Sequence, residues 1–265
     1  PEIIEAGLSG ELVLFVGAGV SKIVGLPSWS EYAWKILKDL QSAGKLDFAE
    51  LDQLKKLDPK KMLSIACQIA EDNDVELNLT KHLLDCDKNN KIYSYLNQIG
   101  CVFVTTNYDE LIAPDLQPSD SHSSSLISTN RILPTDTELA SYLDIPGTVI
   151  HLHGAISKPE TMIVSTKHYL ELYDKPSIKF FLGELFQKKV VLFIGYGLEE
   201  SEILEHILRR GSAQSRKDRR RFSLQGFFRS EFPLYQKLSD YYSSSFGVYL
   251  IGFVRDFKNY EQATE

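Results

Sequence analysis

Nearly continuous apolar runs are the feature that most restricts how this chain can fold. Val190–Gly195 (VVLFIG) and Cys101–Thr106 (CVFVTT) lack the apolar–polar alternation of a strand with one solvated face. Strands covered on both faces, as in parallel sheets, have this pattern. Six runs are predicted to be strands: Leu12–Val16, Cys101–Thr106, Thr148–His153, Val190–Gly195, Phe222–Phe228 and Gly247–Gly252.

Helical patterns separate most of these runs. After a first strand, a long helical stretch, a second strand and a loop, strands and helices alternate. This order predicts an α/β fold with an open, doubly wound, Rossmann-like parallel sheet. Residues 28–100 are too long for one crossover, so we expect a small helical lobe inserted in a single domain that spans residues 1–265. Residues 115–136, rich in Ser, Pro, Asp and Asn, are expected to form a loop.

Local signals support several of the helices. Ser28 and Glu31 have the spacing of a capping box, and Pro176 stands where proline is favoured at a helix start. Residues 60–72 and 74–85 repeat apolar side chains at helical spacing. Residues 200–210 begin acidic and end basic, which suits the helix dipole.

Composition narrows the class of protein. The chain has 265 residues, 43% hydrophobic and 25% charged, and a net charge of −7, which is typical of a globular protein and argues against non-specific nucleic-acid binding. We find neither a secretory signal nor an apolar run of the ~20 residues that a membrane helix needs. The scattered Cys67, Cys86 and Cys101 fit a reducing cytoplasm, and they are too few for a four-cysteine zinc site.

Two further features bear on partners and chain limits. The basic run 216–221 is most simply a solvated loop, and contact with an acidic partner or a phosphate is the alternative. The chain begins with Pro1 rather than Met, and residues 254–265 are predicted to begin a helix. We therefore allow for a native chain that continues beyond residue 265.

A glycine-rich turn follows the first predicted strand. Gly17 would permit a sharp turn, Gly19 would let the backbone approach a ligand, and Ser21 could cap the turn or bind an anion. Free amides at the start of the next helix suit a pyrophosphate. The dinucleotide fingerprint has a third glycine where this chain has Lys22. A tight strand-to-helix turn without a ligand remains the alternative.

Polar residues follow the second predicted strand directly, in the segment 105–109. Asn107 offers both a donor and an acceptor, with which it could orient a ribose hydroxyl or a water. Asp109 could cap a following helix or hold the Asn107 loop in shape. A simple helix N-cap is the alternative for this segment.

Two histidines mark the end of the third predicted strand. Alternation places His151 and His153 on one face of the strand, and Gly154 follows His153 at the strand end. The natural role of His153 is that of a general base near neutral pH. A metal site is a rival because His-x-His is a ligand spacing, although no Asp, Glu or Cys motif completes it. A structural histidine pair is the other alternative.

A second glycine pair, Gly195-Tyr196-Gly197, ends the fourth predicted strand and again indicates close backbone approach, unless it only anchors a helix start. Ligands of such folds bind at the carboxyl ends of the strands, near the topological switch point. The four strand ends are therefore predicted to line one cleft for a phosphate-bearing ligand. The residues favour a nucleotide-binding α/β protein with a histidine base, but they name no reaction.

In combination, these motifs resemble the sirtuin family over about residues 12–204. GAGVS, GLPSW, TTNYD, HLHG and FIGYGLEE stand where sirtuins have Gly-Ala-Gly-Ile-Ser, Gly-Ile-Pro-Asp-Phe-Arg, Thr-Gln-Asn-Ile-Asp, His-Gly and a late Gly-Thr-Ser. The chain departs from the deacylases where Ser28-Trp29-Ser30 replaces Asp-Phe-Arg and where Gly195-Tyr196-Gly197 replaces Gly-Thr-Ser. Between Gly154 and Val190 it has no cysteine for a zinc ribbon. It looks like the sirtuin-like branch of bacterial anti-phage defence.

The resemblance implies an NAD⁺ glycohydrolase that needs no metal and depletes cellular NAD⁺ when activated. It implies an activating partner or further domain, such as an ATPase or an Argonaute-type sensor, a homo-oligomer, and no membrane partner. Asn107 would hold the nicotinamide ribose or the attacking water, and His153 would be the general base. The residues implied to contact NAD⁺ or to support its site are Gly17, Ala18, Gly19, Ser21, Pro27, Trp29, Thr106, Asp109, Gly195, Tyr196 and Gly197.

The implied reaction breaks the bond between nicotinamide and ribose. The cationic nicotinamide leaves without an acid through an oxocarbenium-like transition state, so the site must exclude bulk water, orient one water and polarise the ribose hydroxyls. Three alternatives stay open. They are an NAD-dependent protein deacylase or ADP-ribosyltransferase, a non-catalytic sensor of NAD⁺ or ADP-ribose, and a dehydrogenase.

Overall fold

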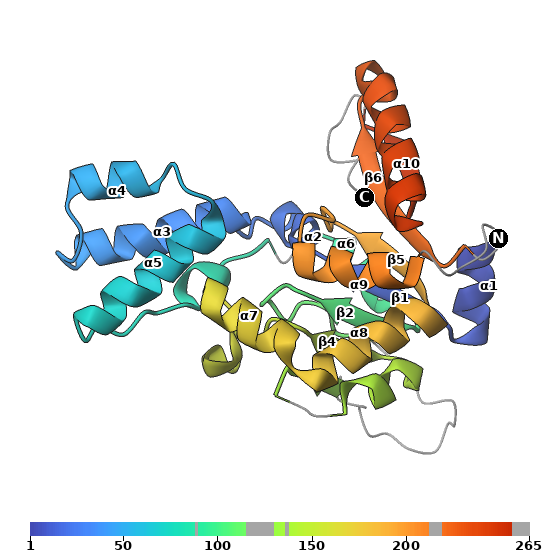
Figure 1. The fold of residues 1–265 in the computed structure, drawn as a ribbon, viewed down its shortest axis with the longest axis horizontal. Helices are drawn as coiled ribbons and strands as arrows, with labels where there is room; N and C mark the ends of the chain where they lie inside the picture. Colours follow the sequence, from blue (N-terminus) through green and yellow to red (C-terminus); the bar gives the residue numbers. More distant parts are fainter. Residues whose placement is uncertain (88–89, 115–129, 136–137, 212–218, 256–265) are drawn as a thin grey trace.

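A parallel sheet lies at the centre of the computed structural model (Figure 1). Its seven strands lie in the order β3-β4-β2-β1-β5-β6-β7, and every neighbouring pair is parallel. The strands are β1 (Leu12–Val16), β2 (Val102–Thr105), β3 (Asn130–Ile132), β4 (Thr148–His151), β5 (Val190–Ile194), β6 (Arg221–Phe227) and β7 (Tyr249–Val254). The structure describes residues 1–87, 90–114, 130–135, 138–211 and 219–255. The predicted α/β fold with a doubly wound parallel sheet is confirmed.

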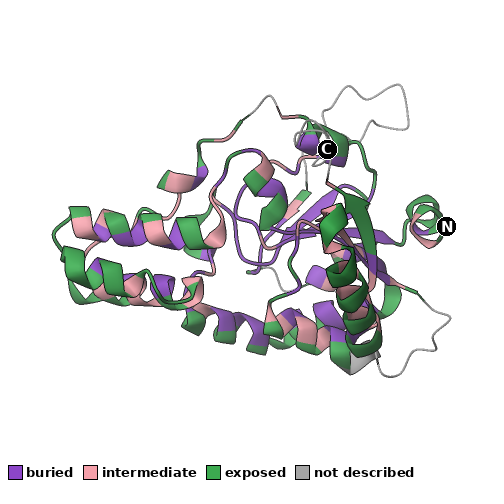
Figure 2. Ribbon diagram, turned by 90° about the horizontal axis from the view of Figure 1, so that it is seen from above, coloured by how far each residue is buried: buried purple, intermediate pink, exposed green. Residues whose placement is uncertain are grey.

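Helices cover both faces of the sheet, which explains its continuous apolar strands. Val13 and Phe15 of β1 pack in one buried cluster with α7 (Thr166–Asp174), α8 (Pro176–Lys188) and α9 (Ser201–Gly211). Leu12 and Leu14 pack in another with α1 (Glu2–Ser9), α2 (Ala18–Ile23) and α6 (Ile92–Asn97). Alternate side chains of a strand point to opposite faces, so both sets are buried. Figure 2 shows the buried strands at the centre and a largely exposed α1.

A helical extension, formed by α3 (Trp29–Ser42), α4 (Phe48–Leu54) and α5 (Pro59–Asp72), projects to the left in Figure 1. Its buried side chains form a third cluster that reaches the sheet domain through Tyr108. The predicted capping box starts α3, because the Ser28 side chain accepts from the Glu31 amide at 3.3 Å and the Glu31 carboxylate accepts from the Ser28 amide at 2.7 Å. The extension covers part of the segment 28–100, and α6 near the end of that segment packs on the sheet.

The helix predicted over residues 74–85 is wrong. Only the short 3₁₀ helix η1 (Lys81–Leu83) forms there. The Oδ1 atom of Asn78 accepts from the Lys81 amide at 3.0 Å and from the Thr80 hydroxyl at 3.1 Å. Such a local side-chain bond gives the backbone an alternative to the helix. Elsewhere in the described residues, 3₁₀ turns form at η2 (Leu139–Asp144), η3 (Pro159–Thr161) and η4 (Arg229–Glu231).

Strand β3 lies inside the segment 115–136 that was predicted to be a loop. It has three residues, of which only Ile132 is buried, so it carries no apolar run for a sequence pattern to detect. It pairs with β4 from Asn130↔Thr148 to Ile132↔Ile150. Residues 115–129 and 136–137 lie outside the described part of the chain.

The prediction of a solvated basic loop at 216–221 is wrong for its last residue. Arg221 begins β6 and is buried, and its guanidinium donates to the carbonyls of Phe186 and Phe246, each at 3.2 Å. Arg220 donates to the Lys188 carbonyl at 2.9 Å. These hydrogen bonds join the start of β6 to the ends of α8 and α10 (Phe232–Phe246). Residues 216–218 lie outside the described part.

The C-terminal part consists of α10 (Phe232–Phe246) and β7, which rise with β6 from the body of the molecule (Figure 1). Strand β7 runs to Val254, two residues beyond the predicted end of the last strand. The helix predicted to begin at residues 254–265 therefore does not include Val254, and residues 256–265 lie outside the described part.

Within the described residues, none of the helices has the length and apolar character needed to cross a membrane.

Candidate functional site

A cleft of about 300 Å³ opens at the carboxyl ends of the strands. It lies beside β1, which has β2 on one side and β5 on the other, so the chain changes direction at this point of the sheet. Of the predicted site residues, all of which the structure describes, only Gly17 is not part of the lining. Those that line it are Ala18, Gly19, Ser21, Pro27, Trp29, Thr106, Asn107, Asp109, His153, Gly195, Tyr196 and Gly197.

The two glycine turns pack against each other. A Cβ atom on Gly17 would lie 2.6 Å from the Gly195 carbonyl oxygen, and one on Gly19 would lie 2.8 Å from the same atom. The Gly19 amide donates to that oxygen at 2.8 Å. The missing side chain of Gly19 thus makes room for Gly195, while its predicted approach to a ligand stays a prediction. Gly195 itself has a φ of +61°, which favours glycine.

We expect Gly17→Ala to lower the free energy of unfolding by about 1–3 kcal/mol, the usual cost of overpacking a buried site. The added methyl group would press on the backbone of Gly195 and Tyr196, which has little room to retreat. Chemical denaturation followed by circular dichroism measures the change. Gly7→Ala is the control, since Gly7 is exposed on α1 and alanine there should stabilise the helix by up to about 1 kcal/mol. Equal effects of the two changes would contradict the packing interpretation.

A buried network fixes the side-chain amide of Asn107. Its Nδ2 atom donates to the Gly17 carbonyl at 3.0 Å and to the Ser21 hydroxyl at 2.8 Å. Ser21 in turn donates to the Asp109 carboxylate at 2.6 Å, and Tyr93 donates to that carboxylate at 3.2 Å. The Ser21 hydroxyl is thus engaged within the protein. Of the two roles predicted for Asp109, the structure has the support of the Asn107 loop. No helix follows Asp109 in residues 107–114, so the N-cap alternative is wrong.

The other end of the same amide is free. Asn107 is buried, and its Oδ1 atom has no hydrogen-bond partner among the residues that the structure describes. A buried polar atom without a partner costs about 1–3 kcal/mol, and such an atom in a cleft requires an explanation. Because Nδ2 is held on two protein acceptors, Oδ1 is presented as a hydrogen-bond acceptor to whatever enters the cleft.

His151 has a structural role. Its Nδ1–H donates to the Asn107 carbonyl at 3.1 Å, so its Nε2 accepts from the Arg131 guanidinium, also at 3.1 Å. Arg131, on β3, also donates to the carbonyls of Glu110 at 2.7 Å and Ile112 at 3.1 Å. Burial lowers the pKa of His151, which keeps the ring neutral. The pair therefore holds the backbone of the loop that carries Asn107.

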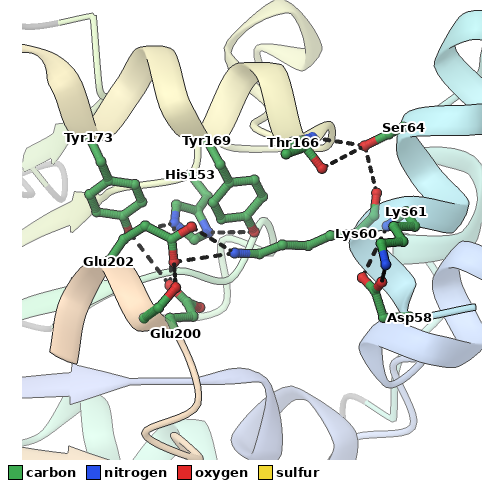
Figure 3. A network of polar contacts seen from close by, with 11 residues as sticks. Asp58, Lys60, Lys61, Ser64, His153, Thr166, Tyr169, Tyr173, Glu200 and Glu202 are labelled. Carbon is green, nitrogen blue, oxygen red and sulfur yellow. Dashed lines mark hydrogen bonds and ion pairs between the residues drawn. The ribbon is translucent and has the colours of Figure 1, made fainter. Parts of the chain in front are cut away.

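His153 lies beyond the end of β4, so strand alternation does not place it with His151. Its Nε2 lies 2.9 Å from the Tyr173 hydroxyl, and its Nδ1 lies 3.4 Å from the Tyr169 hydroxyl (Figure 3). Burial, with a smaller contribution from Lys60, lowers the pKa of His153 to about 3. The ring is therefore neutral at physiological pH, and its pKa is far below the neutral range that the sequence predicted.

Glu200 is the site residue that the sequence interpretation missed. Its carboxylate lies 3.7 Å from His153 Nε2 and accepts from the Tyr173 hydroxyl at 3.5 Å (Figure 3). Burial raises the pKa of Glu200 to about 7. In the sequence, Glu199 and Glu200 read alike as the acidic start of a helix, and nothing distinguishes the one that reaches the histidine.

The predicted metal alternative gains no support from the ligands. Among the described residues, no three His, Cys, Asp or Glu side chains are grouped as a metal ion would need. His151 and His153 make their contacts with protein groups and do not converge on a common point.

The sheet and its cleft define the class of protein. This is a doubly wound, Rossmann-like α/β domain whose ligand cleft opens at the topological switch point, beside an oriented amide and a buried histidine. Residues 101–242 match the model of the SIR2-like domain, which is more than half of the chain. The chain belongs to this family.

Two bacterial proteins are similar in sequence to this chain over most of its length. Defense-associated sirtuin 2 of Bacillus subtilis is 28% identical over 209 residues, which are 76% of this chain and 19% of that protein. NAD(+) hydrolase ThsA of Bacillus cereus (strain MSX-D12) is 25% identical over 210 residues, which are 78% of this chain and 41% of that protein. The chain thus spans about a fifth of the first relative and about two fifths of the second.

Proposed function

We propose that this chain hydrolyses NAD⁺ at the bond between nicotinamide and ribose. The observation that carries the proposal is the unpaired Oδ1 of Asn107, a buried acceptor held in place at the cleft. A ribose hydroxyl or a water molecule supplies the donor that this atom lacks. The name of one relative, an NAD(+) hydrolase, gives independent support for this substrate.

Asn107 and His153 have separate tasks in the proposed reaction. Asn107 Oδ1 accepts a hydrogen bond from the nicotinamide ribose or from the attacking water and so orients it. As the water oxygen bonds to the ribose C1′, the C1′–N bond breaks and its electron pair returns to nicotinamide. His153, neutral in its buried position, accepts the proton that the water loses. The products are nicotinamide, ADP-ribose and one proton.

The remaining residues support this chemistry. Trp29, whose ring lies 5.8 Å from that of Tyr32 and 5.7 Å from that of Tyr108, forms an aromatic wall that limits access of bulk water. Ala18, Gly19 and Gly195–Gly197 remain our prediction for contacts with the phosphates and the adenosine. For Ser21 we propose positioning of Asn107, because its hydroxyl is already engaged with protein atoms.

The test is to incubate the purified chain, and the full-length natural protein, with NAD⁺ and to separate the products by liquid chromatography. Nicotinamide and ADP-ribose in equal amounts are expected. Tight binding of intact NAD⁺ without turnover would instead identify a sensor. Removal of acyl groups from peptides faster than NAD⁺ hydrolysis would identify a deacylase. Either result would overturn the proposal.

We also propose that the activity serves defence against phage, under the control of a partner or a further domain and in an oligomer. The name of the other relative, a defense-associated sirtuin, supports this role. In infected cells that express the full-length protein, the NAD⁺ concentration should fall, and Asn107→Ala should prevent the fall. An unchanged NAD⁺ concentration during infection would contradict the defence role.

A further inference from the structure

The proposed base is enclosed in a way that leaves its proton no direct exit to water. His153 is 2% exposed, and both ring nitrogens face tyrosine hydroxyls. Burial makes an imidazolium at this position unstable, since the pKa of the ring lies near 3. A proton that His153 accepts must therefore pass to another group before the next turnover.

Glu200 is placed to receive that proton. The Tyr173 hydroxyl lies 2.9 Å from His153 Nε2 and donates to Glu200 at 3.5 Å, so Tyr173 connects the two (Figure 3). The pKa of Glu200 lies near 7, which makes its carboxylate a stronger base than His153. Glu200 also lines the cleft, where it can release the proton to solvent once the products leave.

We propose, building on the proposed NAD⁺ hydrolysis, that Glu200 takes the proton from His153 through the hydroxyl of Tyr173. The attacking water takes the place of the Tyr169 hydroxyl, whose contact with His153 Nδ1 is the longer one at 3.4 Å, and loses a proton to that nitrogen. The proton on Nε2 passes to the Tyr173 oxygen. The Tyr173 hydroxyl proton passes at the same time to the Glu200 carboxylate. One O–H bond of water breaks and one O–H bond on Glu200 forms, with no change in oxidation state. Because Glu200 acts on His153 and does not touch the reacting atoms, we class it as a positioning residue.

Two side chains of opposite charge, Lys60 and Glu202, act on the carboxylate of Glu200. Lys60, on α5 of the helical extension, lies 3.1 Å from the Glu202 carboxylate of α9 and 4.0 Å from the ring centroid of Tyr169 (Figure 3). Lys60 lowers the pKa of Glu200, Glu202 raises it, and the hydroxyls of Tyr173 and Tyr196 lower it. The helical extension therefore contributes a charge that tunes the proton acceptor of the cleft.

The first experiment compares the pH dependence of NAD⁺ hydrolysis in the wild-type chain and in Glu200→Gln. In the wild type, kcat should rise with pH through about 7, because the carboxylate form of Glu200 is the one that accepts a proton. Glu200→Gln should remove this rise and lower kcat by at least about 10-fold, with little change in KM. Wild-type kcat and an unchanged midpoint in Glu200→Gln would overturn the proposal.

Two controls accompany this comparison. Glu171→Gln makes the same change at an exposed position of α7, the helix that carries Tyr173, and should leave the profile unchanged. Glu200→Asp keeps a carboxylate and should restore a pH-dependent rise at reduced kcat. A purely structural role of Glu200 would lower the midpoint of thermal unfolding in both Glu200 variants without a change in the shape of the profile, and that outcome would also overturn the proposal.

The second experiment uses two charge variants that should shift the midpoint of the kcat–pH profile in opposite directions. Lys60→Met removes a positive charge and should shift the midpoint to higher pH, whereas Glu202→Gln removes a negative charge and should shift it to lower pH. Lys61→Met, at the neighbouring exposed position where Lys61 pairs with Asp58, should leave it unchanged. Shifts in the same direction, or none, would contradict the tuning of Glu200 by this charge pair.

A third measurement does not depend on turnover. Infrared difference spectra recorded below and above pH 7 should contain a protonated-carboxyl band that Glu200→Gln lacks. If the wild-type chain has this band and releases no nicotinamide, the proposed function fails while the titration of Glu200 near pH 7 stands. If NAD⁺ is hydrolysed and the band is absent, the proton path through Glu200 fails alone.

Discussion

Asn107→Ala is expected to reduce kcat/KM for NAD⁺ hydrolysis by about 10²–10³-fold, the usual loss when one oriented polar group of a reaction site is removed. The change deletes the unpaired Oδ1 acceptor that orients the ribose or the water. It also deletes the two hydrogen bonds of Nδ2, so the Ser21 hydroxyl and the Gly17 carbonyl lose a donor. Initial rates of nicotinamide release at several NAD⁺ concentrations measure the loss.

Two further variants separate orientation from folding. Asn73→Ala removes an exposed asparagine that only caps the end of α5, donating to the Ile69 carbonyl at 2.8 Å, and should keep full activity. Ser21→Ala removes one of the two acceptors of Nδ2 and should give an intermediate loss. If Asn107→Ala kept more than half of the wild-type kcat/KM, the assignment of the reaction site would be wrong.

His153→Gln is expected to lower kcat by about 10²–10⁴-fold, the contribution typical of a general base, with a much smaller change in KM. Glutamine can still bond to the Tyr173 hydroxyl, so the packing survives, but it cannot accept a proton. Steady-state kinetics measure kcat and KM, and calorimetric titration with ADP-ribose checks that the cleft still binds.

The matched control is His82→Gln. His82 pairs with Asp39 at 2.7 Å at the edge of the helical extension and takes no part in the proposed reaction. The activity of His82→Gln should equal that of the wild type. Full activity of His153→Gln would remove the histidine from the mechanism. Loss of ADP-ribose binding in His153→Gln would instead assign the residue to binding.

The sheet was predictable because burial on both faces leaves a strong local mark. In β1, neighbouring side chains such as Leu14 and Phe15 lie in different buried clusters, so the strand reads as one apolar run. The strand-end residues were predictable for a related reason. A parallel sheet brings its carboxyl ends to one edge, so Asn107 and His153 reach the same cleft from β2 and β4.

What the sequence could not predict are contacts between residues far apart in the chain. Arg131 reaches His151 from an edge strand too short to leave an apolar pattern. Glu200 reaches His153 because α7 places Tyr173 between them, and a single sequence contains no signal for that packing. The false helix at 74–85 has a local cause, since apolar spacing gives no warning of the bonds that Asn78 makes.

The contact between the two glycine turns has a consequence for how the motif should be used. Gly17 and Gly19 owe their lack of a side chain to one carbonyl, that of Gly195, nearly 180 residues later in the chain. A side chain at Gly17 or Gly19 therefore meets the backbone of Gly195, and because all three positions are already glycine, none of them can become smaller to make room. When sequences are searched with GAGVS as a signature, the glycines report how two loops fit together, and the identity of the ligand has to be read elsewhere.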